Sequence, residues 1–213
     1  MRITSYINSG KLRSLHPILK EWIRLNRHYS KTVCRTDLWD DCAWWANERA
    51  STGTLAAAAW TKGWVALEEY STRKIREKTH GNGRCDLFFT VGKNKFASEI
   101  KQIFPRINKN NLNILDVRSR FEQACEDARK LFPKEGQRLG ICFVTPRFPP
   151  SQIEHIDYCL ENYLDCLLKN QKKLNFHAVA WYFPKEARKM RWPENKRTYP
   201  GIIILIRSIL RSR

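Results

Sequence analysis

Two short apolar segments, residues 84–91 and 96–103, are separated by only four residues, and this arrangement constrains the fold more than any other feature of the chain. The connection, Gly92-Lys93-Asn94-Lys95, has the glycine and asparagine content that is typical of a tight hairpin turn. We therefore predict a β-hairpin. Apolar residues flank the few charged ones in both segments, which predicts a central position in a sheet, where an unpaired charge is costly.

The charged residues of this hairpin suit metal-assisted chemistry. Side chains alternate along a strand, so Glu99 and Lys101 project from one face and Ile100 from the other. A turn near residues 93–94 brings Asp86 level with Glu99, within reach of one shared ion. Two carboxylates, the carbonyl of Ile100 and waters would suit Mg²⁺, and Lys101 could orient or deprotonate the attacking water. The alternative is a set of ordinary surface charges, with Asp86 paired to Arg84 or to a nearby lysine.

The remaining segments predict an α/β fold with a mixed sheet covered by helices. Residues 64–70 are a strand candidate with helix as the alternative, and residues 71–83 are predicted to be a polar, basic loop. We expect Gln102 to bond to a neighbouring strand or helix, while Glu68 or Glu69 is an alternative carboxylate near the metal. Apolar spacing predicts helices at 10–28, 37–62 (with a possible break at 51–54), 115–132 and 151–168, and strands at 139–144, 176–183 and 202–206.

Two motifs of the hairpin resemble those of the PD-(D/E)xK nuclease superfamily. The segment Gly83-Arg84-Cys85-Asp86-Leu87 resembles its second-strand motif, with Cys85 where proline often stands, and Glu99-Ile100-Lys101 resembles its third-strand motif without departure. Members often carry a glutamate on the first helix, and Glu48 stands at the corresponding place. The resemblance covers about residues 38–145, half of the chain.

The resemblance implies a restriction-endonuclease-like core, in which a central mixed β-sheet is flanked by helices in the order helix, three strands, helix, strand. It implies a catalytic set of Asp86, Glu99, Lys101 and Glu48, with Mg²⁺ (Mn²⁺ as a substitute) bound by Asp86, Glu99, Glu48 and the carbonyl of Ile100. We expect residues 1–36 to form an N-terminal helical extension and residues 37–213 to form the nuclease domain.

A strong positive charge indicates a polyanionic partner. The 39 lysines and arginines exceed the 21 acidic residues, which gives a net charge of +18, and they are spread along the chain. Nucleic acid is the commonest such partner; membrane surfaces and ribosomes are alternatives. Residues 71–83 and the basic, aromatic segment 181–199 are candidate phosphate contacts, although core packing explains the tryptophans of the second segment equally well.

Composition also limits the class of protein. No apolar run approaches the roughly 20 residues of a membrane-spanning helix, so we expect no membrane association. The first residues carry no apolar stretch like that of a secretory signal. Seven cysteines without a Cys-x-x-Cys pair indicate reduced thiols, and we therefore expect a cytoplasmic location with neither a disulfide framework nor a structural zinc site.

These observations lead us to expect a Mg²⁺-dependent endonuclease that hydrolyses phosphodiester bonds in DNA, of a restriction, junction-resolving, defence or mobile-element type. RNA is an alternative substrate. A non-catalytic nucleic-acid-binding module on the same fold is a second possibility. A third is a nuclease subunit that is active only with a partner protein, and a homodimer is also compatible with the sequence.

Overall fold

A mixed β-sheet forms the centre of the computed structural model, which describes residues 4–7, 10–33, 42–76, 79–107, 112–132, 134, 136–188, 190–192 and 196–209. The sheet of these residues has seven strands in the order β1-β6-β7-β5-β4-β3-β2. Strands β4 and β5 are parallel, and every other neighbouring pair is antiparallel. The strands are β1 (Thr4–Ile7), β2 (Ala66–Arg76), β3 (Thr79–Val91), β4 (Asn94–Ile103), β5 (Gln137–Val144), β6 (Ala178–Tyr182) and β7 (Ile202–Ile209).

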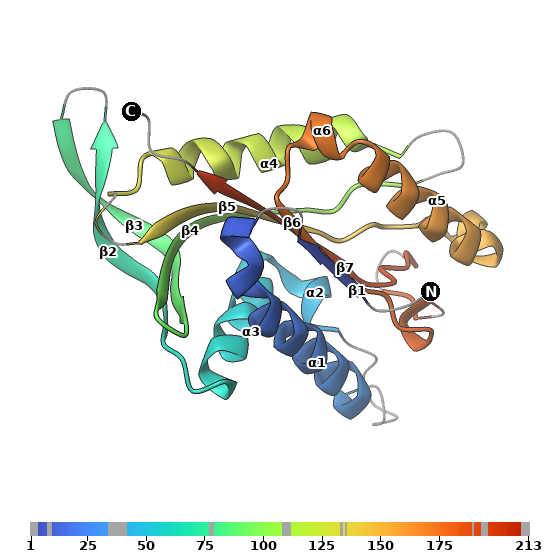
Figure 1. The fold of residues 1–213 in the computed structure, drawn as a ribbon. Coiled ribbons are helices and arrows are strands. Elements are labelled where there is room, and N and C mark those ends of the chain that lie inside the picture. The colour runs from blue at the N-terminus through green and yellow to red at the C-terminus, as the bar shows by residue number, and fades with distance from the viewer. Residues whose placement is uncertain are drawn as a thin grey trace.

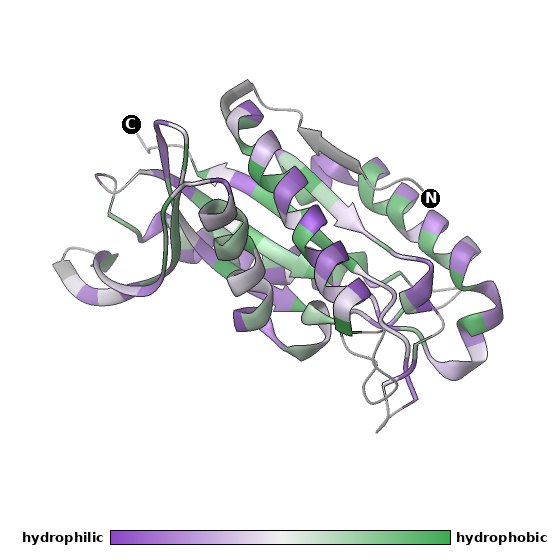
Figure 2. Ribbon diagram, turned by 90° about the horizontal axis from the view of Figure 1, so that it is seen from below, coloured by the Kyte–Doolittle hydropathy of each residue, from purple (hydrophilic) through white to green (hydrophobic). Residues whose placement is uncertain are grey.

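Helices cover both faces of this sheet (Figure 1). One face packs against α1 (His16–Val33), α2 (Ala43–Ala46) and α3 (Glu48–Thr61), and the other against α4 (Ile114–Arg129), α5 (Ile156–Lys169) and α6 (Gln171–Leu174). Short 3₁₀ helices lie at η1 (Gly10–Leu15), η2 (Pro150–His155) and η3 (Glu186–Arg188). Hydrophobic and hydrophilic residues alternate along the covering helices (Figure 2), as expected where one side of each helix is buried.

The predicted class, an α/β fold with a central mixed sheet flanked by helices and with an N-terminal helix, is confirmed. The predicted hairpin is β3 and β4, paired from Val91–Asn94 to Leu87–Ser98, and Gly92 adopts the positive φ of 59° that a tight turn requires. Strand β5 is almost completely buried, which agrees with its continuous apolar run.

The prediction of a loop at residues 71–83 is wrong for the described part of this segment, residues 71–76 and 79–83. Strands β2 and β3 continue through it as a two-stranded ribbon, paired from Ala66–Phe89 to Arg76–Thr79, that projects at one end of the sheet (Figure 1). Arg73, Asn82 and Arg84 are exposed, so this ribbon lacks the alternation of apolar and polar residues by which a half-buried strand is recognised.

The predicted helix at 37–62 also differs in detail. Asp37, its expected N-cap, lies outside the described residues. The break falls at Asn47, between α2 and α3, and not at 51–54. The hydroxyl groups of Thr52 and Thr54 donate to the carbonyls of Glu48 (2.7 Å) and Ser51 (2.8 Å), so polar side chains bond along the helix that they were expected to interrupt.

The described part of the predicted N-terminal extension is built into the main sheet and core. Strand β1, which the sequence pattern did not indicate, pairs with β6. Trp22 of α1 is fully buried, stacks on Phe143 of β5 with 6.2 Å between ring centroids, and donates a hydrogen bond to Thr54 of α3. Among the described residues, no helix has both the length and the apolar character needed to cross a membrane.

Candidate functional site

Along the carboxyl-terminal half of β4, side chains take the place of the main-chain hydrogen-bond partners that β3 provides earlier in the strand. The described pairing with β3 ends at Leu87–Ser98. Beyond it, the amide of Ile100 donates to Asp86 Oδ2 (2.7 Å) and the amide of Gln102 donates to Glu48 Oε2 (2.8 Å). The carbonyl of Ile103 accepts from Thr145, just beyond β5, so main-chain groups of alternate residues face opposite edges of β4. Two carboxylates therefore line the edge that β3 leaves.

The main-chain carbonyl groups of Ile100 and Gln102 accept hydrogen bonds from positively charged side chains. The carbonyl of Ile100 accepts from Lys101 Nζ (3.0 Å), and that of Gln102 accepts from Nε of Arg120 on α4 (3.3 Å). We call this arrangement the β4 edge site; it comprises Glu48, Asp86, Glu99, Lys101 and the main chain of Ile100 and Gln102. Anionic and cationic groups thus bind alternate amides and carbonyls along one strand edge.

Glu99 is the most buried charged residue of the β4 edge site, with 2% of its surface exposed. Nζ of Lys74, on β2, lies 2.9 Å from each carboxylate oxygen, but only Oε2 accepts a hydrogen bond from it. Oε1 is buried and has no hydrogen-bond partner among the described residues. Burial, together with the negative charge of Asp86, raises the pKa of Glu99 to about 7 against the opposing effects of Lys74 and Lys101.

Glu48 reaches the site from the first turn of α3. Asn47 caps this helix by accepting from the amide of Ala50 (3.0 Å), and an acidic residue in the first turn interacts favourably with the helix dipole. Burial raises the pKa of Glu48, Asp86 acts in the same direction, and Lys101 and the Gln102 amide act against them. Asp86 thus acts electrostatically on both Glu48 and Glu99, although the three residues come from a helix and two strands.

Lys101 is partly exposed, with 21% of its side chain accessible, and bridges two elements. Besides the Ile100 carbonyl, it approaches Oδ2 of Asp127 on α4 at 3.7 Å, and Asp127 also binds Lys130 (2.7 Å). An ammonium group held between a carbonyl and a partly exposed carboxylate keeps its position without being fully neutralised. This is the property expected of a lysine that acts on an incoming anion.

The structure brings together all the residues predicted for the site: Glu48, Asp86, Glu99, Ile100 and Lys101. Arg84, the alternative partner of Asp86, instead lies 3.4 Å from Glu69, which also approaches Arg49 at 3.9 Å. The side chain of Gln102 donates to Trp44 O and Thr145 Oγ1, both at 3.3 Å, which confirms the expected bond to neighbouring elements.

Three residues of the surroundings were not singled out from the sequence for this site: Lys74, Arg120 and Asp127. Lys74 belongs to the segment predicted as a loop, and the other two lie on α4 among many charged residues. Their proximity to β4 depends on how the ribbon and α4 pack on the sheet. The spacing of charged residues along the chain carries no signal for that.

The donor atoms of the β4 edge site fit Mg²⁺ in their chemistry. In the part of the chain described, no group of three or more His, Cys, Asp or Glu side chains is arranged to hold a metal ion. Main-chain amides donate to one oxygen each of Asp86 and Glu48, and Lys74 donates to one oxygen of Glu99. Mg²⁺, however, is commonly held by one or two carboxylates with waters. Asp86, Glu99 and the Ile100 carbonyl offer such oxygens, and the unbonded Oε1 of Glu99 is a buried acceptor suited to a cation.

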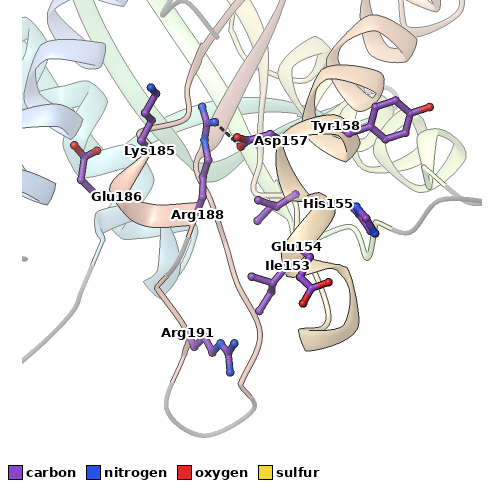
Figure 3. Close-up of a pocket in the computed structure, with 10 residues that line it drawn as sticks. Ile153, Glu154, His155, Asp157, Tyr158, Lys185, Glu186, Arg188 and Arg191 are labelled. Carbon is purple, nitrogen blue, oxygen red and sulfur yellow. Dashed lines mark hydrogen bonds and ion pairs between the residues drawn. The ribbon is translucent and has the colours of Figure 1, made fainter.

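A hollow of about 1000 Å³ lies elsewhere (Figure 3). It is bounded by the start of α5 and by Lys185, Glu186, Arg188 and Arg191. Arg188 forms an ion pair with Asp157 at its side, and acids and bases mix along its lining. None of the residues predicted for catalysis lines it. Its size alone assigns it no chemistry.

The aromatic residues of the segment 181–199 serve the core. Trp181 and Tyr182 are 7% and 3% exposed. Trp192 packs edge-on against Trp45 of α2 with 5.5 Å between ring centroids, and the carbonyl of Tyr199 accepts hydrogen bonds from the indoles of Trp44 and Trp45 (both 3.0 Å). These contacts favour core packing over base stacking for the tryptophans of this segment.

Comparison of the chain with protein-family models, with curated proteins and with solved structures finds no match. The function of this chain therefore has to be inferred from the chemistry of its own residues. The β4 edge site is the place where acids, a buried unbonded oxygen and a partly exposed lysine converge.

Proposed function

We propose that the chain is a Mg²⁺-dependent endonuclease that hydrolyses phosphodiester bonds in DNA. The observation that carries this proposal is that the carboxylates of Asp86 and Glu48, next to Glu99 and Lys101, take the place of main-chain groups of β3 as hydrogen-bond partners of β4. Burial, with Asp86 as a further cause, raises the pKa of both Glu48 and Glu99, and acids perturbed in this way are typical of functional sites. The element order α3, β2, β3, β4, α4, β5 matches that of a restriction-endonuclease-like core and supports the same proposal.

In this proposal, Asp86, Glu99, Glu48 and the Ile100 carbonyl would hold the metal. The chemistry that a bound Mg²⁺ supplies is neutralisation of phosphate charge and a lower pKa for the attacking water. Lys101 can orient that water or take its proton, and its positive charge stabilises the negative charge that develops on the phosphate. Asp127, 3.7 Å from Lys101 Nζ, keeps the ammonium group close to the Ile100 carbonyl.

The rest of the surface supports a nucleic-acid substrate. A net charge of +18 attracts polyanions over a long range. The β2–β3 ribbon carries exposed Arg73 and Arg84 next to Asp86, and a two-stranded ribbon has the dimensions to enter the major groove. We also propose a cytoplasmic location, in which Cys85 and Cys125, whose thiol pKa burial raises to about 12, stay reduced.

The test is cleavage of a panel of plasmid, linear duplex, single strand, branched junction and RNA with Mg²⁺, Mn²⁺ or EDTA. The parent protein is compared with Asp86→Ala and Lys101→Ala, and with Lys93→Ala, which removes an exposed lysine from the turn of the same hairpin. We expect metal-dependent cutting by the parent and by Lys93→Ala only. Cutting that survives in Asp86→Ala and Lys101→Ala, or that ignores EDTA, would contradict the proposal.

The ion pair between Lys74 and Glu99 favours a second candidate, a nuclease subunit that is active only with a partner protein. While Lys74 donates a hydrogen bond to Oε2 of Glu99, its positive charge competes with a metal ion for this carboxylate. A partner or the substrate itself could draw Lys74 away. Tight, salt-sensitive binding by the isolated chain without cleavage, together with cleavage by the Lys74→Met variant, would favour this candidate.

A further inference from the structure

Three arginines line a small cavity beyond the ends of β4 and β5. Its volume is about 240 Å³, and acidic side chains are absent from its described lining, which consists of Arg106, Arg147, Phe148, Pro149, Pro150 and Arg197. Three positive charges around one cavity repel each other, and a bound anion relieves that repulsion. We call it the three-arginine pocket.

Main-chain pairing holds the arginines in place. Arg106 and Arg147 form a parallel bridge that extends the β4–β5 pairing, with hydrogen bonds from Arg147 N to Pro105 O (2.9 Å) and from Ile107 N to Arg147 O (3.0 Å). Phe148 and Thr198 exchange two further bonds (2.9 and 3.0 Å), which fixes the chain next to Arg197. Ile107, Phe148 and Thr198 are fully buried. The backbone of the pocket is thus preorganised, and mainly the arginine side chains remain to be ordered when a ligand binds.

Arg147 provides an independent sign of a missing partner. Its Nε is buried and has no hydrogen-bond acceptor among the described residues, and neither Arg147 nor Arg106 takes part in an ion pair there. Leaving a buried donor unbonded is unfavourable. A phosphate supplies several acceptor oxygens, and the planar guanidinium group matches it through parallel hydrogen bonds.

The pocket also lies on the same strand path as the β4 edge site. Arg106 follows Lys101 by five residues, which at a rise of about 3.3 Å per residue places their Cα atoms about 16.5 Å apart in an extended chain. Along a DNA duplex the rise is about 3.4 Å per nucleotide, so this distance corresponds to about five nucleotides. A nucleic acid whose reactive phosphate lay at Lys101 would have a second backbone phosphate within reach of Arg106.

We infer that the three-arginine pocket binds one backbone phosphate of the nucleic acid, up to about five nucleotides from the bond that is cleaved. This inference rests on the proposed function for its substrate, although the pocket itself does not depend on cleavage. Binding of one phosphate at a fixed distance sets the register of the strand at the β4 edge site. The pocket thereby positions the bond to be cut, without any reading of bases.

The experiment couples a protein charge to a single phosphate. The tightest-binding nucleic acid of the panel is made as a series in which a neutral methylphosphonate replaces one backbone phosphate at a time. Dissociation constants are measured for the Lys101→Ala protein and for two double variants that carry Lys101→Ala together with either Arg147→Gln or Arg106→Gln. Arg106 is an exposed position. Lys172→Gln, an exposed lysine of α6, is the control, and thermal unfolding checks that every variant is folded.

We expect one methylphosphonate to weaken binding by Lys101→Ala about tenfold, the loss of roughly one charge-assisted hydrogen bond, and to have little further effect once Arg147 is replaced. The Lys172→Gln protein keeps full sensitivity. Equal sensitivity of the arginine variants at every phosphate would overturn the inference. So would Arg147-dependent binding of inorganic phosphate together with nucleic-acid binding that ignores Arg147, since the pocket would then serve free phosphate.

The outcomes separate the pocket from the nuclease. Cleavage by the parent protein without coupling between Arg147 and any phosphate leaves the proposed function standing and removes the pocket. Coupling between Arg147 and one phosphate without cleavage would confirm the phosphate site and contradict the proposed nuclease, because the chain would then only bind nucleic acid.

Discussion

Lys74 reaches Glu99 through the space that a side chain at Gly83 would occupy. A Cβ atom built on Gly83 would lie 2.8 Å from Cδ and 2.9 Å from Cγ of Lys74, both closer than real contacts allow. Beyond that crossing, Nζ of Lys74 lies 2.9 Å from the carboxylate of Glu99. A glycine in the motif next to Asp86 therefore determines whether a buried acid of the β4 edge site has a counter-charge.

The Gly83→Ala substitution should displace Lys74 and destabilise the protein by about 1–3 kcal/mol at pH 8. Without Lys74 nearby, the pKa of Glu99 in the folded state rises further above that of the unfolded chain. The folded protein then holds the extra proton at low pH and must give it up as the pH rises, so the loss should be smaller at pH 5.

Urea unfolding at the two pH values measures this difference. Gly10→Ala is the matched control, because a Cβ there meets nothing within 4 Å and the stability should change little at either pH. If Gly83→Ala is as stable as the parent protein at pH 8, Lys74 does not need the glycine to reach Glu99.

Glu99→Gln should remove a pH dependence from the stability of the metal-free protein. The pKa of Glu99 is about 7 in the folded state, above the 4.5 of an unperturbed carboxyl, so its contribution falls as the pH rises from about 4.5 to about 7. Glutamine does not titrate. Relative to the parent, the variant should gain up to about 3 kcal/mol between pH 4.5 and pH 8, while cleavage is lost. A constant difference between the two proteins across this range would show that Glu99 does not titrate there.

Mg²⁺ should raise the melting temperature of the parent protein at pH 8, and EDTA should reverse the effect. A ligand at 100 times its dissociation constant stabilises the folded state by about 2.7 kcal/mol. Glu99→Gln should lose this response. Glu68→Gln is the control and should keep the response, because its carboxylate is not part of the β4 edge site. Burial raises the pKa of Glu68 as it does that of Glu99, so the two acids are comparable in this respect. An identical Mg²⁺ response of the parent and Glu99→Gln would place the cation elsewhere.

The sequence alone was sufficient to predict the strands that carry the acid-x-lysine motif. Gly92 and Asn94 indicated the turn, the alternation around Glu99 and Lys101 indicated β4, and the apolar run of β5 indicated a strand buried on both faces. These are local signals of turn chemistry and periodicity. They were enough to bring Asp86, Glu99 and Lys101 together, whereas Glu48 was implied only by the resemblance to the PD-(D/E)xK nucleases.

The sequence could not predict the surroundings of these residues. The ribbon at 71–83 is polar on both sides, and part of its pairing is distant in the chain, since Ile75 donates to the carbonyl of Lys130 (2.7 Å). Lys74 is placed by that packing and by Gly83, neither of which leaves a periodic pattern. Likewise, Arg106, Arg147 and Arg197 come from three separate segments that main-chain bridges join only in the folded protein.

Glu48→Gln should separate the structural role of this residue from its chemical role. The amide oxygen of glutamine can still accept from the amide of Gln102, so the bond of 2.8 Å has a replacement. The substitution removes the interaction with the helix dipole, which is worth about 0.3–1 kcal/mol. It also removes the cost of burying a charged carboxylate, the effect that raises the pKa of Glu48, so the two changes act in opposite directions. We expect the free energy of unfolding to change by less than about 1 kcal/mol while cleavage falls at least tenfold. Unchanged cleavage would leave Glu48 only its structural role, the bond to the Gln102 amide and the interaction with the dipole of α3.

The close approach of α4 to β5 is the contact on which the α4 side of the β4 edge site depends. A Cβ atom on Gly140 would lie 2.5 Å from Sγ of Cys125 and 2.8 Å from its Cα, so Gly140→Ala should push α4 outward. Because α4 carries Arg120 and Asp127, the shift should weaken cleavage as well as stability, the latter by about 1–3 kcal/mol. Adding Cys125→Ala removes the sulfur but not the Cα, so we expect at most partial recovery of both the unfolding free energy and the cleavage rate. Full recovery in the double variant would show that the sulfur alone, and not the helix backbone, sets the distance between α4 and the sheet.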